Sequence, residues 1–315
     1  MLVNENENEN EIAKSIEIGA AATESESGYV PVAAAEASTT TKSTDLSLPS
    51  RLSPSRMSDF KKCPKSFHFK SVLRIPTETT IAQLKGTLVH LVLERLFDLP
   101  RDSRTPAAAI ALIPVCLSEL NDNTSYTKII QDNFSLLSSE SQELITKYFA
   151  MENPTNFDPT ARELWVHGKV EEMPIVGVID RLDTVHNSDG SITSFISDYK
   201  TGKLPAPRYR AEAFFAMKVY ALLQNQANKP VNRLRLIYIK EAERKAVLRL
   251  EITPAILKDT LDEVSQLVTS IKTAHANNSW PAIVNPLCNW CDFKPICPAH
   301  TTKDNQQISL RVSPW

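Results

Sequence analysis

The chain is short of glycine, has no long apolar run and contains few cysteines. Only 7 of its 315 residues are glycine, and it has no Gly-x4-Gly-Lys-Ser/Thr sequence, which excludes a P-loop ATPase motor in this chain. No run approaches the roughly 20 apolar residues of a membrane helix. The acidic, Asn-rich start lacks the basic and apolar regions of a secretory signal. We therefore expect a cytoplasmic protein that does not enter a membrane.

Charge and composition divide the chain into a tail and a body. The first 50 residues carry nine acidic and two basic side chains, whereas the whole chain has a net charge of -2, so the remainder is mildly basic. Residues 1–48 are rich in Asn, Glu, Ala, Ser and Thr and cannot bury a core, which predicts a disordered acidic tail. Residues 49–315 are predicted to form one domain. Its basic character suits a polyanionic partner.

Hydrophobic periodicity predicts an α/β domain. Helices are predicted at about 54–62, 80–98, 106–120, 139–151, 207–226 and 254–277. Strands are predicted at 162–170, 174–186, 191–199, 233–240 and 245–251. This order predicts a mixed central β-sheet flanked by helices on both faces, followed by an irregular segment rich in Cys, Trp and Pro.

Two neighbouring β-prone runs each carry an acidic residue. Asp180 lies in the first run, and Asp198 and Lys200 lie two apart in the second, so these two share a face of a strand. A three-residue hairpin loop at 188–190 would put Asp180 opposite Asp198, whereas a two-residue turn would put it opposite Tyr199. The first register predicts two carboxylates beside an ammonium, which suits Mg²⁺ or Mn²⁺ and an activated water.

A solvated surface ion pair is the ordinary alternative for Asp-x-Lys at a strand end. His90, one turn after Gly86, is a candidate nitrogen ligand that would favour Mn²⁺. A histidine on an apolar helix is, however, more often a core residue. Lys200 would orient the water or offset charge in the transition state. Together these residues suit phosphodiester hydrolysis.

Three cysteines follow a Cys-x2-Cys-x5-Cys spacing, which favours metal or cluster ligation in an intracellular chain. They are Cys288, Cys291 and Cys297, and Cys63 beside Pro64 is the candidate fourth ligand. Spacing alone leaves a Zn²⁺ site and a [4Fe–4S] cluster open. Either would join distant chain segments as a staple. Cys116, at an apolar helical position, is expected to be an ordinary buried thiol.

The predicted 207–226 helix carries basic and aromatic residues near its start. Arg208 and Arg210, just past Lys203, are candidate phosphate contacts. The ordinary alternative is an amphipathic helix that covers the sheet, and both roles are compatible.

Taken together, these motifs resemble the RecB-type nucleases of the PD-(D/E)XK superfamily. In chain order they are Leu52–Arg56 with Cys63-Pro64, Gly86–His90, Gly177–Asp183, Asp198–Gly202 and the cysteine triplet. The resemblance covers about residues 50–300 and implies a restriction-endonuclease-like core. It implies that His90, Asp180 and Asp198 are metal ligands. It also implies that Lys200 is catalytic, and at the cysteine site it favours a [4Fe–4S] cluster over a zinc ion.

The resemblance implies a metal-dependent deoxyribonuclease, commonly an exonuclease on single-stranded DNA, in repair or recombination. The family's helix after the Asp-x-Lys strand usually reads Gln-x-x-x-Tyr. Tyr220, a further expected site residue, is present, but Ala216 stands at the glutamine position and cannot make its hydrogen bond. The alternative is therefore a catalytically weak or inactive DNA-binding subunit of a larger repair complex, and a zinc-binding adaptor is a third reading. A helicase, if one is needed, would be a separate protein.

Overall fold

The computed structural model describes residues 46–241 and 246–301, so the predicted tail at 1–48 lies almost wholly outside the described residues. A five-stranded sheet has the order β1-β2-β3-β4-β5. Its strands are β1 Ala161–Val170, β2 Met173–His186, β3 Ile192–Lys200, β4 Arg233–Tyr238 and β5 Val247–Glu251. The β3–β4 pair is parallel and the other pairs are antiparallel. The predicted mixed sheet is confirmed.

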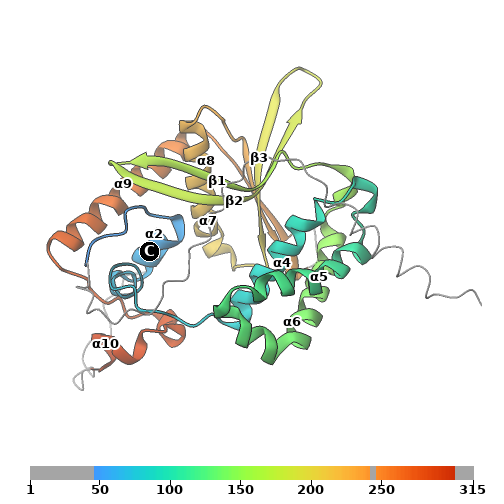
Figure 1. The fold of residues 1–315 in the computed structure, drawn as a ribbon. Helices are drawn as coiled ribbons and strands as arrows, with labels where there is room; N and C mark the ends of the chain where they lie inside the picture. Colours follow the sequence, from blue (N-terminus) through green and yellow to red (C-terminus); the bar gives the residue numbers. More distant parts are fainter. Residues whose placement is uncertain (1–45, 242–245, 302–315) are drawn as a thin grey trace, which may run out of the picture. The chain divides into compact units, whose positions relative to one another are not determined.

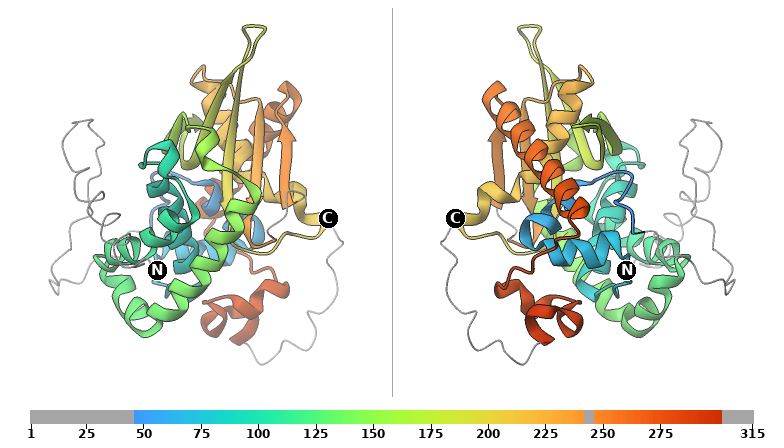
Figure 2. Two further views of the ribbon diagram at one scale, coloured as in Figure 1. Left: turned by 90° about the vertical axis from the view of Figure 1, so that its right-hand side faces the viewer. Right: turned by 90° about the vertical axis from the view of Figure 1, so that its left-hand side faces the viewer.

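Helices flank both faces of this sheet. The helices of the described residues are α2 Pro54–Lys62, α3 Pro64–Phe67, the π-helix η1 His68–Val72, α4 Ile81–Leu96, α5 Pro106–Asn121, α6 Thr124–Met151, α7 Arg210–Ala213, α8 Phe215–Gln226, α9 Pro254–Ala276 and α10 Pro298–Thr301. Helices α8 and α9 pack on each other and on β1, and α4, α5 and α6 form a second layer (Figure 1). Figure 2 shows the sheet between these layers. No helix among the described residues has the length and apolarity needed to cross a bilayer.

Two predicted helices differ from the observed ones. The 207–226 helix is divided into the 3-10 turn η4 Pro207–Tyr209, α7 and α8, with a break at Phe214 (φ -82°, ψ -3°). Phe214 and Phe215 are adjacent and both buried, whereas neighbours in a continuous helix would point about 100° apart. The 139–151 helix is the second half of α6, which kinks at Asn133.

The β2–β3 hairpin has the register that the acidic motif requires. Arg181 pairs with Ser197, so Asp180 and Asp198 come next in the same register. The five residues 187–191 connect the two strands, and the Asn187 amide donates to the Ser191 carbonyl at 2.9 Å, which leaves a three-residue loop at 188–190. Its last residue, Gly190, has a φ of 81°, in the left-handed region that glycine enters without steric cost. The prediction of an odd-length loop is confirmed.

Cys63 separates helices α2 and α3 and lies next to the C-terminal segment that begins near Pro281. The residue before a proline is pushed towards extended backbone, and Cys63, which precedes Pro64, has φ -166° and ψ 107°. Helix α2 ends there. The Lys65 amide donates to the Pro281 carbonyl at 3.1 Å, and the Ile283 amide lies 3.4 Å from Cys63 Sγ. The C-terminal segment, predicted to be irregular, contains the 3-10 turns η7 Pro286–Trp290 and η8 Lys294–Ile296.

Candidate active site

Charged side chains from three adjacent strands meet a histidine from helix α4. They are His90 from α4, Glu163 from β1, Asp180 from β2, and Asp198 and Lys200 from β3. Ligand atoms of His90, Glu163 and Asp180 all lie within 4.8 Å of one another. The structure thus brings two of the three predicted ligands into one group and adds a third acid that the sequence analysis missed.

His90 is oriented with one ring nitrogen towards Asp180. Its Nε2 lies 2.8 Å from the Tyr199 carbonyl oxygen, which can only accept, so Nε2 carries the proton. Nδ1 then offers a lone pair in the neutral ring, and it lies 3.3 Å from Asp180 Oδ2. The Tyr199 amide donates to the same Oδ2 at 3.0 Å. Adjacent ligands of an octahedral Mg²⁺-like ion are about 3 Å apart, so these two atoms suit one ion.

Glu163 joins the group through the register of β1 with β2. Arg162 pairs with Arg181 and Leu164 with Ile179, so Glu163 lies opposite Asp180. Its φ of 43° is strained for a non-glycine residue, and such strain often accompanies functional sites. Burial, with the nearby charges of Asp180 and Glu94, raises the pKa of Glu163 to about 7.

Asp180 is also held in an environment that resists its negative charge. Burial raises the pKa of its carboxyl to about 6, and the charge of Asp198 adds to this shift. His90 and the hydrogen bond from the Tyr199 amide act in the opposite direction. A bound cation would lower the pKa of Asp180, because it favours the ionised forms of both Asp180 and Asp198.

Asp198 and Lys200 form an ion pair next to this group. Lys200 Nζ lies 2.6 Å from Asp198 Oδ2. That oxygen is buried and accepts no hydrogen bond of good geometry among the described residues, so it retains coordinating capacity. Burial lowers the pKa of Lys200, but the charge of Asp198 outweighs it and the net shift is upward. The ammonium therefore stays protonated at neutral pH.

The donor set suits a hard divalent cation. One imidazole nitrogen and two carboxylates can hold it through His90, Glu163 and Asp180, with Asp198 adjacent. Oxygen donors favour Mg²⁺ or Mn²⁺, and the nitrogen shifts the preference towards Mn²⁺. Burial, together with repulsion between the carboxylates, raises the pKa of both Glu163 and Asp180, and a bound cation would favour their ionised forms.

Tyr220 of α8 lies over the β2 backbone close to these acids. A Cβ atom added to Gly177 would stand 2.2 Å from Tyr220 Cε1, so only glycine leaves room for the ring. Burial together with the charges of Asp198 and Asp180 raises the pKa of Tyr220 to about 12. Tyr220 is therefore neutral. Ala216 lies one turn before it on the same helix.

A buried ionic layer adjoins the site. Arg181 is 1% exposed, and its Nη1 donates to Glu152 at 2.8 Å and its Nε to Asp183 at 2.9 Å. Nη1 also donates to the Tyr199 hydroxyl. Arg235 donates to the same Glu152 at 2.6 Å. Tyr199 thus joins the two regions, since its backbone contacts His90 and Asp180 while its side chain enters this layer.

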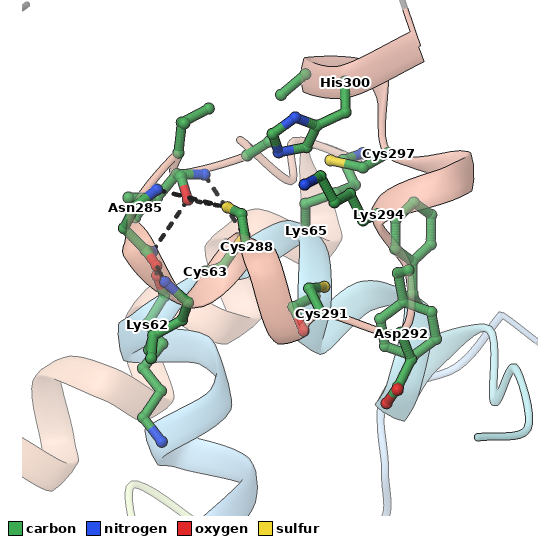
Figure 3. Close-up of a pocket in the computed structure, with 18 of the residues that line it drawn as sticks. Lys62, Cys63, Lys65, Asn285, Cys288, Cys291, Asp292, Lys294, Cys297 and His300 are labelled. Atoms are coloured by element: carbon green, nitrogen blue, oxygen red, sulfur yellow. Dashed lines mark hydrogen bonds between the residues drawn. The ribbon is translucent and has the colours of Figure 1, made fainter. Parts of the chain in front are cut away.

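The four cysteines of the predicted cluster line one pocket of about 210 Å³. Figure 3 shows Cys63, Cys288, Cys291 and Cys297 around it. The Asn285 amide lies 3.4 Å from Cys288 Sγ, as the Ile283 amide does from Cys63 Sγ. Such N–H groups stabilise thiolates. Cys116 lies elsewhere, buried in α5, where burial raises its pKa to about 12.

Comparison with known proteins identifies the family. Residues 51–298 match the family model described as the PD-(D/E)XK nuclease superfamily. No curated protein matches the chain.

Two solved structures are among those similar to this chain. A Eubacterium rectale protein described as a candidate exonuclease is 14% identical, with a TM-score of 0.47, and the match covers 77% of this chain and 87% of that one. The protein SSO0001 is 16% identical, with a TM-score of 0.37, covering 81% and 89%. Both TM-scores are below 0.5, so neither likeness bears on function. The family match covers most of the chain, and the chain belongs to the PD-(D/E)XK nuclease superfamily, whose members use divalent metal ions.

Proposed function

We propose that this chain is a metal-dependent DNA nuclease that hydrolyses phosphodiester bonds, acting as an exonuclease on single strands. The observation that carries the proposal is the approach of His90 Nδ1 to Asp180 Oδ2 at 3.3 Å, with the Glu163 carboxylate in the same group. The imidazole nitrogen and the carboxylate oxygen both offer lone pairs, so a cation or a proton between them would stabilise this approach. We assign His90, Asp180, Asp198 and Glu163 to metal binding.

When bound, the divalent ion would supply a water of lowered pKa and positive charge for the phosphate. The remaining roles belong to the chain's own side chains. Lys200, kept protonated and held by Asp198, would contact a phosphate oxygen and stabilise negative charge that develops there. Tyr220 stays neutral at working pH because its pKa is raised to about 12, so we assign it a positioning role rather than that of a base.

The test is hydrolysis of end-labelled DNA with Mn²⁺. Wild-type protein should shorten linear single strands and leave circular single strands intact, whereas Asp198→Ala and Lys200→Ala should lose at least about a hundredfold in rate. Asp189→Asn is the matched control, because Asp189 is a carboxylate on the hairpin tip whose side chain accepts hydrogen bonds only from Ser191 among the described residues. Equal activity of wild type and Asp198→Ala would refute the assignment.

Ala216 favours a second candidate, a weak or inactive DNA-binding subunit of a larger repair complex. The family glutamine would stand one turn before Tyr220, and alanine offers no hydrogen bond there. Ala216→Gln separates the two candidates: a gain of cleavage from an inert wild type supports the subunit, whereas an already active wild type excludes it. We propose action in the cytoplasm in repair or recombination, with any helicase supplied by a separate protein.

We also propose that the cysteine pocket holds a [4Fe–4S] cluster, as in the RecB-type nucleases. Sulfurs on one zinc ion would be about 3.8 Å apart, given Zn–S bonds near 2.3 Å. Among the described residues no three cysteine sulfurs lie within 4.8 Å of one another, and this wider spacing supports a polynuclear cluster over zinc.

The cluster proposal is tested by metal analysis and absorbance. Protein purified without oxygen should contain iron and absorb broadly near about 400 nm. Cys288→Ser should lose both and unfold at a lower temperature, since the staple between α2 and the C-terminal segment is broken. Cys116→Ser is the matched thiol control and should retain its iron. Stoichiometric zinc without iron would contradict the cluster.

A further inference from the structure

Exposed apolar side chains gather on the segment that carries the cysteine triplet. They are Ile283, Val284, Leu287, Trp290 and Ile296. Trp290 is 78% exposed, more than any other large apolar side chain among the described residues. An indole held open to solvent on a short 3-10 turn is a ready stacking surface.

Basic side chains lie next to this indole. Lys65, Lys294 and His300 line the same pocket as Trp290 and surround the sulfurs (Figure 3). The contacts of the two ammonium groups are with neutral partners: Lys294 Nζ lies 3.3 Å from Asn289 Oδ1, and Lys65 Nζ lies 5.8 Å from the centre of the Phe69 ring. Asp59, an acid on the same rim, is already paired with Lys70 at 2.9 Å. A second acid, Asp292, also lines the pocket, but the rim carries four lysines (Lys62, Lys65, Lys70 and Lys294) against these two acids. It therefore retains positive charge beside an exposed aromatic face.

A contact between two helices joins this rim to the strand end that carries Lys200. Lys61, near the end of α2, lies 2.7 Å from Glu212 of α7. Helix α7 directly follows Tyr209, which is 55% exposed and lies under the Arg208 guanidinium at 4.7 Å. The segment after Lys200 thus presents a second exposed aromatic ring with a cation, on the turn η4 directly before the helix α7 that α2 contacts.

We propose that Trp290 and the lysines around it bind single-stranded nucleic acid, with a base stacked on the indole and phosphates near Lys65 and Lys294. Bases of a single strand offer free aromatic faces, and stacking on an exposed ring beside a basic groove is how sequence-tolerant binding is achieved. Duplex bases are already stacked and offer no such face. The inference deepens the proposed nuclease function, since it assigns a binding site for the single strand outside the acidic site, and it rests on that function for its biological role.

The test is binding of fluorescein-labelled oligothymidylate to the full-length protein without divalent metal, followed by anisotropy. Trp290→Ala should weaken binding about tenfold or more, and Trp290→Phe should stay within about threefold of wild type, because phenylalanine keeps a stacking face. The Lys65→Ala/Lys294→Ala double variant should weaken binding and flatten its salt dependence. Trp290→Ala should leave that salt dependence unchanged.

Trp165→Ala is the matched control, because Trp165 is also an exposed indole, at 64%, but lies on the edge strand β1. It should bind as wild type, and a duplex of equal length should not distinguish Trp290→Ala from wild type. Wild-type binding by Trp290→Ala, or equal losses in both tryptophan variants, would overturn the proposal. The proposal would also be overturned if the Trp290→Ala protein bound the single strand normally but no longer bound a protein partner.

Oligouridylate in parallel decides between DNA and RNA. The thermal unfolding temperature of each variant shows whether folding is intact. Because the assay needs no cleavage, Trp290-dependent binding by a protein that never hydrolyses DNA would refute the nuclease and keep this inference. DNA cleavage that is unchanged in Trp290→Ala would support the nuclease and refute this inference.

Discussion

The close approach of Tyr220 to the Gly177 backbone makes a sharp test of how the site is built. In Gly177→Ala the new Cβ would stand 2.2 Å from Tyr220 Cε1 and 2.9 Å from Cδ1. Ordinary contacts begin near about 3.4 Å, so the ring must shift by roughly 1 Å or the β2 backbone must move. Both lie in a packed region, and overpacking of this kind costs about 1–3 kcal/mol.

This cost exceeds the opposing gain from alanine, which stabilises a strand by about 0.5–1 kcal/mol relative to glycine. We therefore expect Gly177→Ala to lower the unfolding temperature by about 2–8 °C in calorimetry. The ring neighbours Asp180 and Asp198, so Mn²⁺ affinity should fall as well. Gly202→Ala is the matched control, since no atom lies within 4 Å of its added Cβ, and its unfolding temperature should change little.

A double-mutant cycle isolates the clash from other effects. In a Tyr220→Ala background the ring is absent, so Gly177→Ala should be neutral or slightly stabilising, which gives a coupling energy of about 1–3 kcal/mol. If Gly177→Ala costs the same in both backgrounds, the ring is not what requires glycine at this position.

Three further predictions concern the charged groups. The folded-state pKa values of Asp180 and Glu163 are raised to about 6 and about 7, so the metal-free folded protein binds more protons than the unfolded chain between about pH 4 and 7, and its stability should fall as pH rises through that window. Mn²⁺ affinity should rise over the same window, because the protons must leave; pH-independent affinity in titration calorimetry would contradict this. Glu163→Gln should weaken Mn²⁺ binding while stabilising the metal-free protein above pH 7, and losses in both would point to a purely structural role. Tyr199→Phe removes the hydroxyl that accepts from Arg181 and should cost about 1 kcal/mol of stability, raising the Mn²⁺ concentration for half-maximal cleavage with little change in the rate at saturation.

The β2–β3 register could be predicted because loop parity and side-chain alternation determine it jointly. Only an odd loop puts Asp180 opposite Asp198, and Gly190 is a residue that permits such a loop. The roles assigned to these side chains remain predictions, since geometry alone does not test them.

The place of Glu163 in the acidic group was not predicted, because the turn that pairs β1 with β2 has an unusual sequence. Residues Glu171 and Glu172 both have positive φ, 49° and 59°, between the paired Val170 and Met173. Such two-residue turns ordinarily carry Asn or Gly, so the sequence contains no hairpin signal there. Had the turn been recognised, counting along the two strands would have put Glu163 opposite Asp180.

The buried ionic layer could not be predicted from the sequence either, because arginine is among the residues least often fully buried. Arg181 is nevertheless almost wholly enclosed, with its guanidinium 4.7 Å from the centre of the Phe157 ring. A charge at this position becomes tolerable only when Glu152 and Asp183 arrive from other elements. Only the tertiary structure supplies that information.

The contrast between Asp183 and Asp180 explains why one acid belongs to the architecture and the other to a cation site. Burial raises the pKa of both carboxyls. Asp183 has the buried Arg181 beside it at 2.9 Å, so its charge is matched within the chain. The ammonium that acts on Asp180, Lys200, is already paired with Asp198 at 2.6 Å, and the side chain paired with Asp180 itself is the imidazole of His90 at 3.3 Å. Among the described residues, Asp180 and Glu163 therefore lack the buried guanidinium that matches Asp183, and a divalent ion is the species whose charge and ligand preference would stabilise their ionised forms.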